Sequence, residues 1–388
     1  MRASDYCCVL SHVRIPVVFT LLCLAAACES RAGLMGESAE SDLAGLESNY
    51  SQFGAFRTSV GYRDNIFLSP FAPTGRTFGR GEAEFVVSSL PLQAWQWTAL
   101  LNGDVLRYFR TAPGAGGEQQ WFVHGDLRWN GSERFFTTLA TQGYYQDMVL
   151  DLSETEAVRV VAPVKVRGAM LTASTHLPAP GGFALVPSVR AHWSDYLDYS
   201  ADYQENQEGL RLEWKQTDLL VISAGGQLLQ RNFSERTQYT AGGRSLPDTH
   251  LHFKQSSGDL KVQSSWIWLG KWTASAAASR MQNRDDGSGY FDYDRNRGKA
   301  DVGWSTDRWS ITCGGDRQHS TYLVQTAGIG IAPPARVSTD TELSLRVERH
   351  FSSRWTVFAE GRHEQSTSNQ EEFSYRARSI SSGVELNF

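Results

Sequence analysis

The stretch Trp355-Thr356-Val357-Phe358-Ala359-Glu360-Gly361-Arg362 places apolar or small residues at odd positions and mostly polar residues at even positions. Strict alternation puts one set of side chains on each face of a β-strand. The same period recurs in Leu343-Ser344-Leu345-Arg346-Val347-Glu348, in Leu210-Arg211-Leu212-Glu213-Trp214 and in Leu260-Lys261-Val262-Gln263. From about residue 55 to the end of the chain, alternation is the dominant signal, and it predicts an all-β fold.

Composition alone is that of a soluble chain. The 388 residues have a net charge of -5, and the sequence has a mean hydropathy of -0.37. A nucleic-acid-binding chain normally carries a basic excess, so that class is disfavoured. The 12 Trp, 14 Tyr and 19 Phe exclude a disordered chain. Beyond the N-terminus there is no apolar run near the ~20 residues that a membrane helix needs.

The alternating segments predict about sixteen strands, and fourteen to eighteen also fit. Their connections alternate between short and long, the long ones being 69–77, 111–117, 148–156, 233–246 and 322–337. This order is typical of a transmembrane antiparallel up-and-down β-barrel, which has short periplasmic turns and long outer loops. The predicted strands are 55–68, 78–90, 94–110, 118–130, 134–147, 157–176, 182–197, 205–216, 218–232, 247–268, 271–283, 289–305, 307–321, 338–351, 353–366 and 373–388.

The N-terminus has the features of an export signal. Basic Arg2 and Arg14 flank an apolar core at 15–24, and three alanines follow. We therefore expect a signal peptide at 1–27, a flexible periplasmic lead-in at 28–52 and the barrel at 53–388. The stretch before Cys28 resembles a lipoprotein acylation motif, which leaves lipidation of Cys28 open. Only Cys313 lies beyond this region, so no disulfide framework is expected.

Tryptophan marks one end of the predicted barrel. Ten of the twelve Trp lie within a few residues of a predicted short turn, and only Trp121 and Trp193 do not. Indole rings favour the membrane interface, where the ring is half buried and its N–H stays hydrated. The residues predicted to form this aromatic girdle are Trp95, Trp97, Trp129, Trp214, Trp268, Trp272, Trp304, Trp309 and Trp355, with Trp266 beside them.

The chain ends in Ser381-Ser382-Gly383-Val384-Glu385-Leu386-Asn387-Phe388, which resembles the C-terminal β-signal of Gram-negative outer-membrane β-barrel proteins. Ser381, Gly383, Leu386 and Phe388 match its constrained positions. The resemblance implies the outer membrane as location and the barrel assembly machinery as partner. The opening strand at 59–70 weakly resembles that of porin-like barrels linked to polysaccharide export.

Parity from the last strand assigns the two faces. With Phe388, Leu386 and Val384 facing lipid, the inward set is polar and of both signs. A charge facing lipid near the bilayer midplane costs about 2–4 kcal/mol, so such charges should be rare. The same alternation places Arg376 and Arg378 on the lipid face, which requires either that they lie above the apolar band or that a bulge shifts the alternation. Pro187 separately predicts a bulge or an earlier strand end. The predicted lumen-lining residues are Lys165, Arg167, Arg211, Glu213, Arg295, Arg297, Lys299, Asp301, Glu342, Arg346, Glu348, Glu360 and Arg362.

Motifs for catalysis and cofactors are absent from the sequence: it contains no P-loop, dinucleotide-binding glycine motif, HExxH or nucleophile elbow. We therefore expect no enzyme activity, cofactor or metal. An alternative hypothesis is an enzyme whose active site lies at the rim of the barrel and uses Asp316, His319 and Ser320. His250 and His252, two residues apart, are more simply exposed than metal-binding. The acidic stretch 285–294 could bind a divalent cation or bridge lipopolysaccharide phosphates, and the apolar loop 322–337 could fold inward.

The sequence thus predicts an outer-membrane channel that passes hydrophilic solutes or an exported polymer. A barrel of about sixteen strands leaves an aqueous lumen, whose opposing charges select the permeating solute. The alternative is a non-conducting barrel that acts as an adhesin or as a structural partner of a surface polysaccharide or protein system. The expected surroundings are outer-membrane lipid and lipopolysaccharide. The solute, the direction of transport and the oligomeric state stay open.

Overall fold

The computed structural model describes residues 50–89, 94–112, 115–132, 135–152, 159–217, 219–328 and 330–388. The predicted signal peptide, Cys28, most of the lead-in 28–52 and the predicted turn at 91–93 lie outside these residues. No helix among the described residues is long and apolar enough to cross a membrane.

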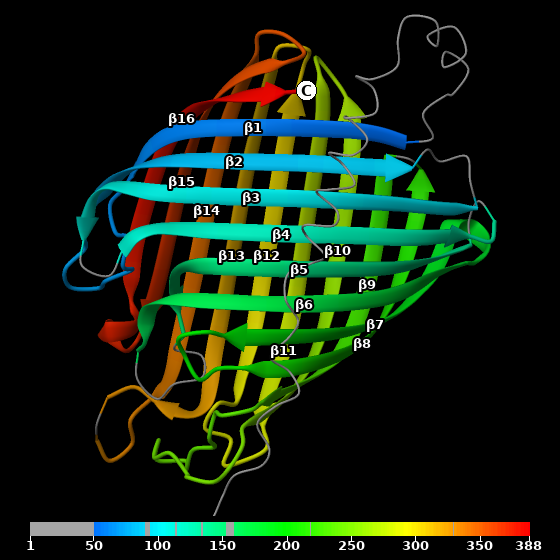
Figure 1. Cartoon of the computed structure of the whole chain (residues 1–388). Coiled ribbons are helices and arrows are strands. Elements are labelled where there is room, and N and C mark those ends of the chain that lie inside the picture. The colour runs from blue at the N-terminus through cyan, green and yellow to red at the C-terminus, as the bar shows by residue number, and fades with distance from the viewer. Residues whose placement is uncertain are drawn as a thin grey trace, which may run out of the picture. The chain divides into compact units, whose positions relative to one another are not determined.

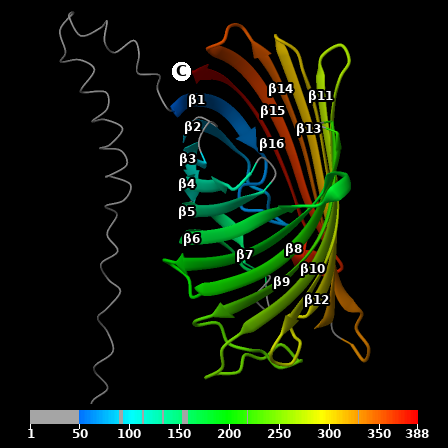
Figure 2. The same cartoon turned by 90° about the vertical axis from the view of Figure 1, so that its right-hand side faces the viewer.

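Within the described residues, sixteen antiparallel strands form one closed barrel in which each strand pairs with its neighbours in sequence and β1 pairs with β16 (Figure 1). In Figure 2, strands β2–β6 and β11–β15 form opposite walls. The strands are β1 (Tyr50–Arg63), β2 (Arg76–Ser89), β3 (Trp95–Ala112), β4 (Ala115–Asn130), β5 (Phe136–Asp151), β6 (Val161–Pro178), β7 (Phe183–Tyr196), β8 (Tyr203–Thr217), β9 (Leu220–Phe233), β10 (His252–Ile267), β11 (Lys271–Asp285), β12 (Tyr293–Ser305), β13 (Trp309–Thr326), β14 (Ala335–His350), β15 (Trp355–Ser368) and β16 (Tyr375–Asn387).

All sixteen predicted segments are strands, but several boundaries move. β1 begins at Tyr50, before the predicted boundary at 53. The predicted long loop at 111–117 is wrong, because β3 continues to Ala112 and β4 begins at Ala115. The loop predicted at 322–337 shrinks to 327–334, since β13 and β14 continue to pair there. Strands at the loop end gain pairing partners that local composition does not indicate.

Pro187 lies inside β7 without causing the predicted bulge or strand end. β7 keeps one register with β6 on both sides of it, from Ser174↔Ser188 to Leu177↔Leu185, and Pro187 itself pairs with Leu210 of β8. Pairing with β6 is interrupted only around Pro187, where the missing N–H removes a donor. The strand therefore tolerates this proline at the cost of local hydrogen bonds.

The barrel closes at the seam between β1 and β16. The N–H groups of Gly54 and Phe388 each donate to the other residue's carbonyl oxygen at 2.9 Å. At Gly383 the two strands approach so closely that a Cβ atom would lie 2.1 Å from the carbonyl oxygen of Thr58. This close approach of backbone is a physical reason for glycine at a position that the terminal motif constrains.

A bulkier residue at 383 should therefore weaken the seam. We expect Gly383→Val to lower the free energy of unfolding by about 1–3 kcal/mol, the usual cost of overpacking. Gly361→Val in neighbouring β15 is the matched control, because a Cβ there meets no atom within 4 Å. Heat-modifiable mobility in gel electrophoresis measures the folded fraction. Equal melting temperatures for the two variants would contradict this account of the seam.

Candidate functional site

Residues paired directly across two strands lie on the same face of the wall, so register assigns each side chain to the lumen or the exterior. The outward face is mainly apolar. Leu260, Leu343, Leu345 and Val357 are 43–52% exposed, although they are large and apolar. A continuous belt of this kind is stable only if lipid, rather than water, surrounds it.

The tryptophans border this belt at the turn end. Trp95 is paired with Trp129, and Trp272 is paired with both Trp266 and Trp304. Their ring centroids lie 6.0–6.5 Å apart. The structure places the strand residues among the predicted girdle set on the outward face near the turns, while Trp268 lies in the β10–β11 turn.

The lumen face of the same strands, by contrast, is lined by charged side chains. The chain is an outer-membrane β-barrel. Its apolar exterior, aromatic border and polar interior are the arrangement of porin-like barrels of the Gram-negative outer membrane.

One lumen wall, formed by β1–β4 and β14–β16, carries an excess of carboxylates and is called the acidic wall below. Ion pairs there join five arginines to nine carboxylates. Arg57 contacts Glu385 at 2.5 Å, and Arg80 binds Asp104 through two hydrogen bonds of 2.7 and 2.9 Å. The nine carboxylates are Glu82, Glu84, Asp104, Glu118, Glu342, Glu348, Glu360, Glu364 and Glu385.

The opposite wall, formed by β7–β13, carries an excess of cations and is called the basic wall. Glu205 is only 4% exposed and is paired with Arg231 at 2.8 Å and Arg190 at 3.3 Å. The inward cations of these strands are Arg190, Arg211, Lys215, Arg231, Lys261, Lys271, Arg295, Arg297 and Lys299, and the inward carboxylates are Glu205, Glu213, Asp259, Asp285, Asp301 and Asp316. Opposed walls of unlike charge impose a transverse electric field on the lumen.

The structure places most of the predicted lumen residues inward. These are Arg211, Glu213, Arg295, Arg297, Lys299, Asp301, Glu342, Arg346, Glu348, Glu360 and Arg362. Ion pairs bring several together, including Arg362 with Glu342 at 3.0 Å and Arg346 with Glu360 at 3.1 Å.

The prediction that Lys165 and Arg167 line the lumen is wrong. They share a face with Leu171, which is 43% exposed on the exterior, and they pair with Asp198 and Asp195 at the loop end of the barrel. Val164 and Val166 point inward instead and are almost fully buried. Valines and cations alternate in this stretch, so polarity predicts that the cations face the lumen and the valines face lipid. The structure has the opposite arrangement.

Arg376 and Arg378 do lie on the outward face, at the loop end of β16. β16 pairs with β15 without a register shift over Ser366↔Tyr375 to Trp355↔Leu386. Of the two explanations left open by the sequence, the bulge is therefore wrong.

The β1–β2 loop, residues 64–75, folds back into the barrel. Ile66 is 1% exposed and packs against Phe78 and Tyr108, which face inward. Asn65 holds the turn by donating to the carbonyl oxygens of Ser69 and Arg376. Residues 64–68 are expected at the end of the first strand, but β1 ends at Arg63, and the apolar run Ile66-Phe67-Leu68 belongs to the inward loop.

Arg159, from the β5–β6 connection, fixes that loop across the lumen. It donates to the carbonyl oxygen of Leu68 at 2.5 Å and its guanidinium lies 5.5 Å from the ring centroid of Tyr375 in β16. One side chain thus connects the β5–β6 segment with the β1–β2 loop and with the closing strand. Together these contacts narrow the loop end of the lumen.

The loop predicted to constrict the lumen does not fold inward. The described residues of this loop, 327–328 and 330–334, project beyond the barrel end (Figure 1), and Ile331 is fully exposed. The apolar composition that suggested an inward loop is partly explained by β13 and β14, which absorb the flanking residues of 322–337.

The three residues of the hypothetical rim active site do not come together in the structure. Asp316 and Ser320 face the lumen, whereas His319 faces outward and contacts Thr339 at 2.9 Å. Ser320 instead accepts a hydrogen bond from Arg295 at 3.0 Å. A nucleophile and its base must lie within hydrogen-bond reach, and opposite faces of a strand prevent this.

The acidic stretch 285–294 uses its carboxylates for its own structure. Asp285 accepts hydrogen bonds from the N–H groups of Gly287, Gly289 and Phe291, each at 2.8 Å. Burial raises the pKa of Asp292, which accepts from the N–H of Asp285. Among the described residues, no cluster of three potential metal ligands is found.

No family model and no curated protein matches the sequence. Among solved structures, the chain is similar to a BenF-like porin from Pseudomonas fluorescens, with 7% identity and a TM-score of 0.48 over 89% of this chain and all of that chain. The chain is also similar to an anion-selective porin from Comamonas acidovorans, with 10% identity and a TM-score of 0.46 over 88% of this chain and all of that chain. A third similar structure is a bacterial polysaccharide outer-membrane secretin, with 11% identity and a TM-score of 0.42 over 86% of this chain and 97% of that chain. At these scores the assignment of the fold rests on the strand pairing itself.

Loss of the Arg159 side chain should release the inward loop. We expect Arg159→Ala to raise single-channel conductance, because the β1–β2 loop loses its contact at Leu68. Arg244→Ala, in the exposed β9–β10 loop, is the control and should leave conductance unchanged. Equal conductance of both variants would show that Arg159 does not hold the constriction.

Proposed function

We propose that the protein is a channel that admits small hydrophilic solutes across the outer membrane. The observation that supports this best is the separation of charge across the lumen. An acidic wall faces a basic wall, and the β1–β2 loop packs inside the barrel against β2 and β3 at the loop end. Solutes that pass must exchange hydration water for these fixed charges, which selects for polar molecules.

The charge arrangement favours small solutes over a wide polymer path. Arg63 reaches from β1 to Glu118 of β4 at 3.7 Å and to Glu364 of β15 at 3.6 Å. Such pairs lie near the inward loop and reduce the free cross-section there. An exported polysaccharide would need this region to open, so it is the second candidate, supported only by the weak resemblance of the opening strand.

The main competing function is a non-conducting barrel that serves as an adhesin or structural partner. Ion pairs alone do not exclude it, because charged side chains can satisfy one another in a closed lumen. Reconstitution in planar bilayers separates the two functions: stepwise conductance supports the channel, and its absence at several protein concentrations favours the non-conducting barrel.

The two walls predict opposite effects of charge removal. We expect Arg295→Gln/Arg297→Gln/Lys299→Gln to shift permeability toward cations and Glu82→Gln/Glu84→Gln to shift it toward anions. At these distances in water the change is about twofold to fivefold in the permeability ratio. The reversal potential in a salt gradient measures it.

Lys165→Gln is the matched control, since it removes one positive charge from the outward face. It should leave the reversal potential unchanged. A shift as large as that of the basic-wall variant, or shifts of the same sign for both walls, would contradict the proposed field.

A further inference from the structure

The outward face of β10–β13 changes from apolar to cationic toward the loop end. Four cations face outward there, and they form what we call the outer cationic patch: Lys254, Arg280, Arg284 and Arg317. On the outward face of these four strands, within the described residues, Asp294 is the only carboxylate. The channel function makes no use of this patch, because it lies on the opposite face of the wall from the lumen.

The patch lies at a defined depth in the membrane. Arg280 and Arg317 each follow an outward girdle tryptophan, Trp272 and Trp309, by eight residues in the same strand. Eight residues span about 26 Å along a strand, or roughly 20 Å across the membrane once the strand tilt is included. This places both guanidinium groups close to the border between the apolar band and the headgroups of the outer leaflet.

The other side of the barrel carries an aromatic ring at this depth. In β4, the residue eight positions from Trp129 is Trp121, which is 42% exposed on the outward face. An aromatic ring is the usual choice for a membrane border. β11 and β13 therefore replace an ordinary border residue with a permanent cation.

The fold neutralises these four cations only in part, because Arg280 and Arg284 share one outward carboxylate, Asp294. Lys254 is paired directly with Arg284 across β10 and β11, and like charges at such positions destabilise a sheet. Arg284 contacts Asp294 at 2.7 Å, while Arg280 is 68% exposed and lies 3.5 Å from the same carboxylate. Among the described residues, neither Lys254 nor Arg317 has a carboxylate within ion-pair distance. An external anion would relieve this repulsion.

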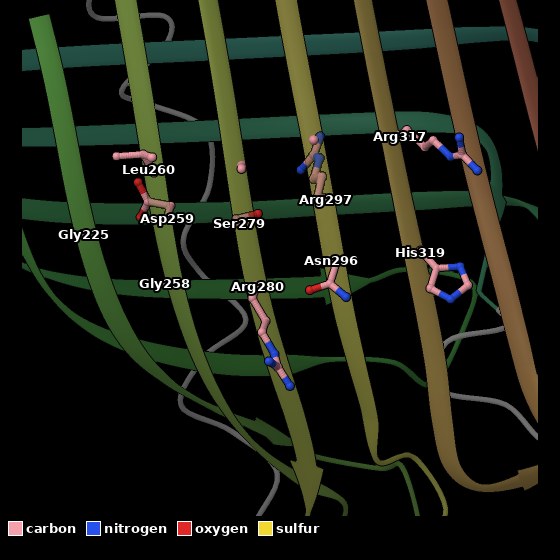
Figure 3. A pocket seen from close by; sticks show the side chains of 12 residues that line it. Gly225, Gly258, Asp259, Leu260, Ser279, Arg280, Asn296, Arg297, Arg317 and His319 are labelled. Carbon is pink, nitrogen blue, oxygen red and sulfur yellow. The ribbon is translucent and has the colours of Figure 1, made fainter.

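A shallow hollow of about 780 Å³ lies beside the patch. Arg280, Asn296, Arg317 and His319 project from three adjacent strands around it (Figure 3). Eight of its twelve lining residues face outward, among them the small Gly258, Ala278 and Gly298 next to Leu260. The other four, Gly225, Asp259, Ser279 and Arg297, belong to the lumen face of the same strands. The site thus combines polar donors toward the loop end with an apolar depression toward the membrane centre.

We propose that the outer cationic patch and this hollow bind a phosphorylated glycolipid of the outer leaflet. Arginine binds phosphate through paired, charge-assisted hydrogen bonds. Arg280 and Arg317 lie two strands apart and are offset by two residues along the strands, which sets them about 12 Å apart. One headgroup with more than one phosphate can bridge them. The lipid is favoured over a soluble phosphate because Arg280 and Arg317 share the outward face with the apolar belt, which begins beside them at Leu260.

The test is binding of lipid A, carrying its phosphates, to the full-length protein in detergent micelles, followed by native mass spectrometry. We expect R280Q/R317Q to weaken binding roughly tenfold or more, the size associated with loss of charge-assisted hydrogen bonds. R167Q is the matched control: it removes an outward cation at the same barrel end that is already paired with Asp195. It should bind lipid A as the unmodified protein does.

Three further arms identify the ligand. Dephosphorylated lipid A should bind at least tenfold more weakly than lipid A. Phosphatidylglycerol should not compete at equal concentration, and inorganic phosphate should not displace the lipid. Equal binding by R280Q/R317Q, or equal binding of phosphatidylglycerol or dephosphorylated lipid A, overturns the proposal.

Folding of each variant is checked by heat-modifiable mobility. If the double variant does not fold, R317Q alone provides the same test, because Arg317 is exposed and its side chain makes no ion pair with the described residues. Channel conductance is measured in parallel: its loss would bear on the proposed channel, whereas lipid binding bears only on the patch.

Discussion

Hydrogen-bond closure between β1 and β16 is the constraint on which the rest of the structure depends. In hydrocarbon no water is present to satisfy backbone N–H and C=O groups, so a sheet can cross a membrane only without free edges. The reciprocal bonds between Gly54 and Phe388 and the close approach at Gly383 complete that closure. Because the sheet is closed, every strand has one face toward lipid and one toward the lumen.

This two-face geometry explains how one chain contains both an apolar belt and a charged interior. Where lipid meets the wall, Leu343 and Leu345 tolerate large exposure. One residue after Leu345, and therefore on the opposite face, Arg346 is held by Glu348 and Glu360. The mean hydropathy of the chain averages these two faces, which is why composition alone resembles that of a soluble protein.

The fold and much of the candidate site could be predicted because alternation is a local property. Parity placed Arg297, Glu342 and Arg362 on the lumen face without knowledge of any contact. It failed at Lys165 and Arg167, where Val164 and Val166 lie buried on the inward face. What alternation could not supply is the partner of each side chain: His319 contacts Thr339, and Ser320 accepts a hydrogen bond from Arg295.

The sequence by itself determined the all-β barrel, the approximate strand count, the aromatic border and the face of most charged residues, because each follows from period-two spacing within a single strand. Only the tertiary structure decided which charges meet, since the ion pairs of the acidic wall join strands far apart in the chain. It also decided that the β1–β2 loop enters the lumen and that Arg159 holds it there. Those features depend on closure of the barrel, which brings β1, β5–β6 and β16 around one shared space.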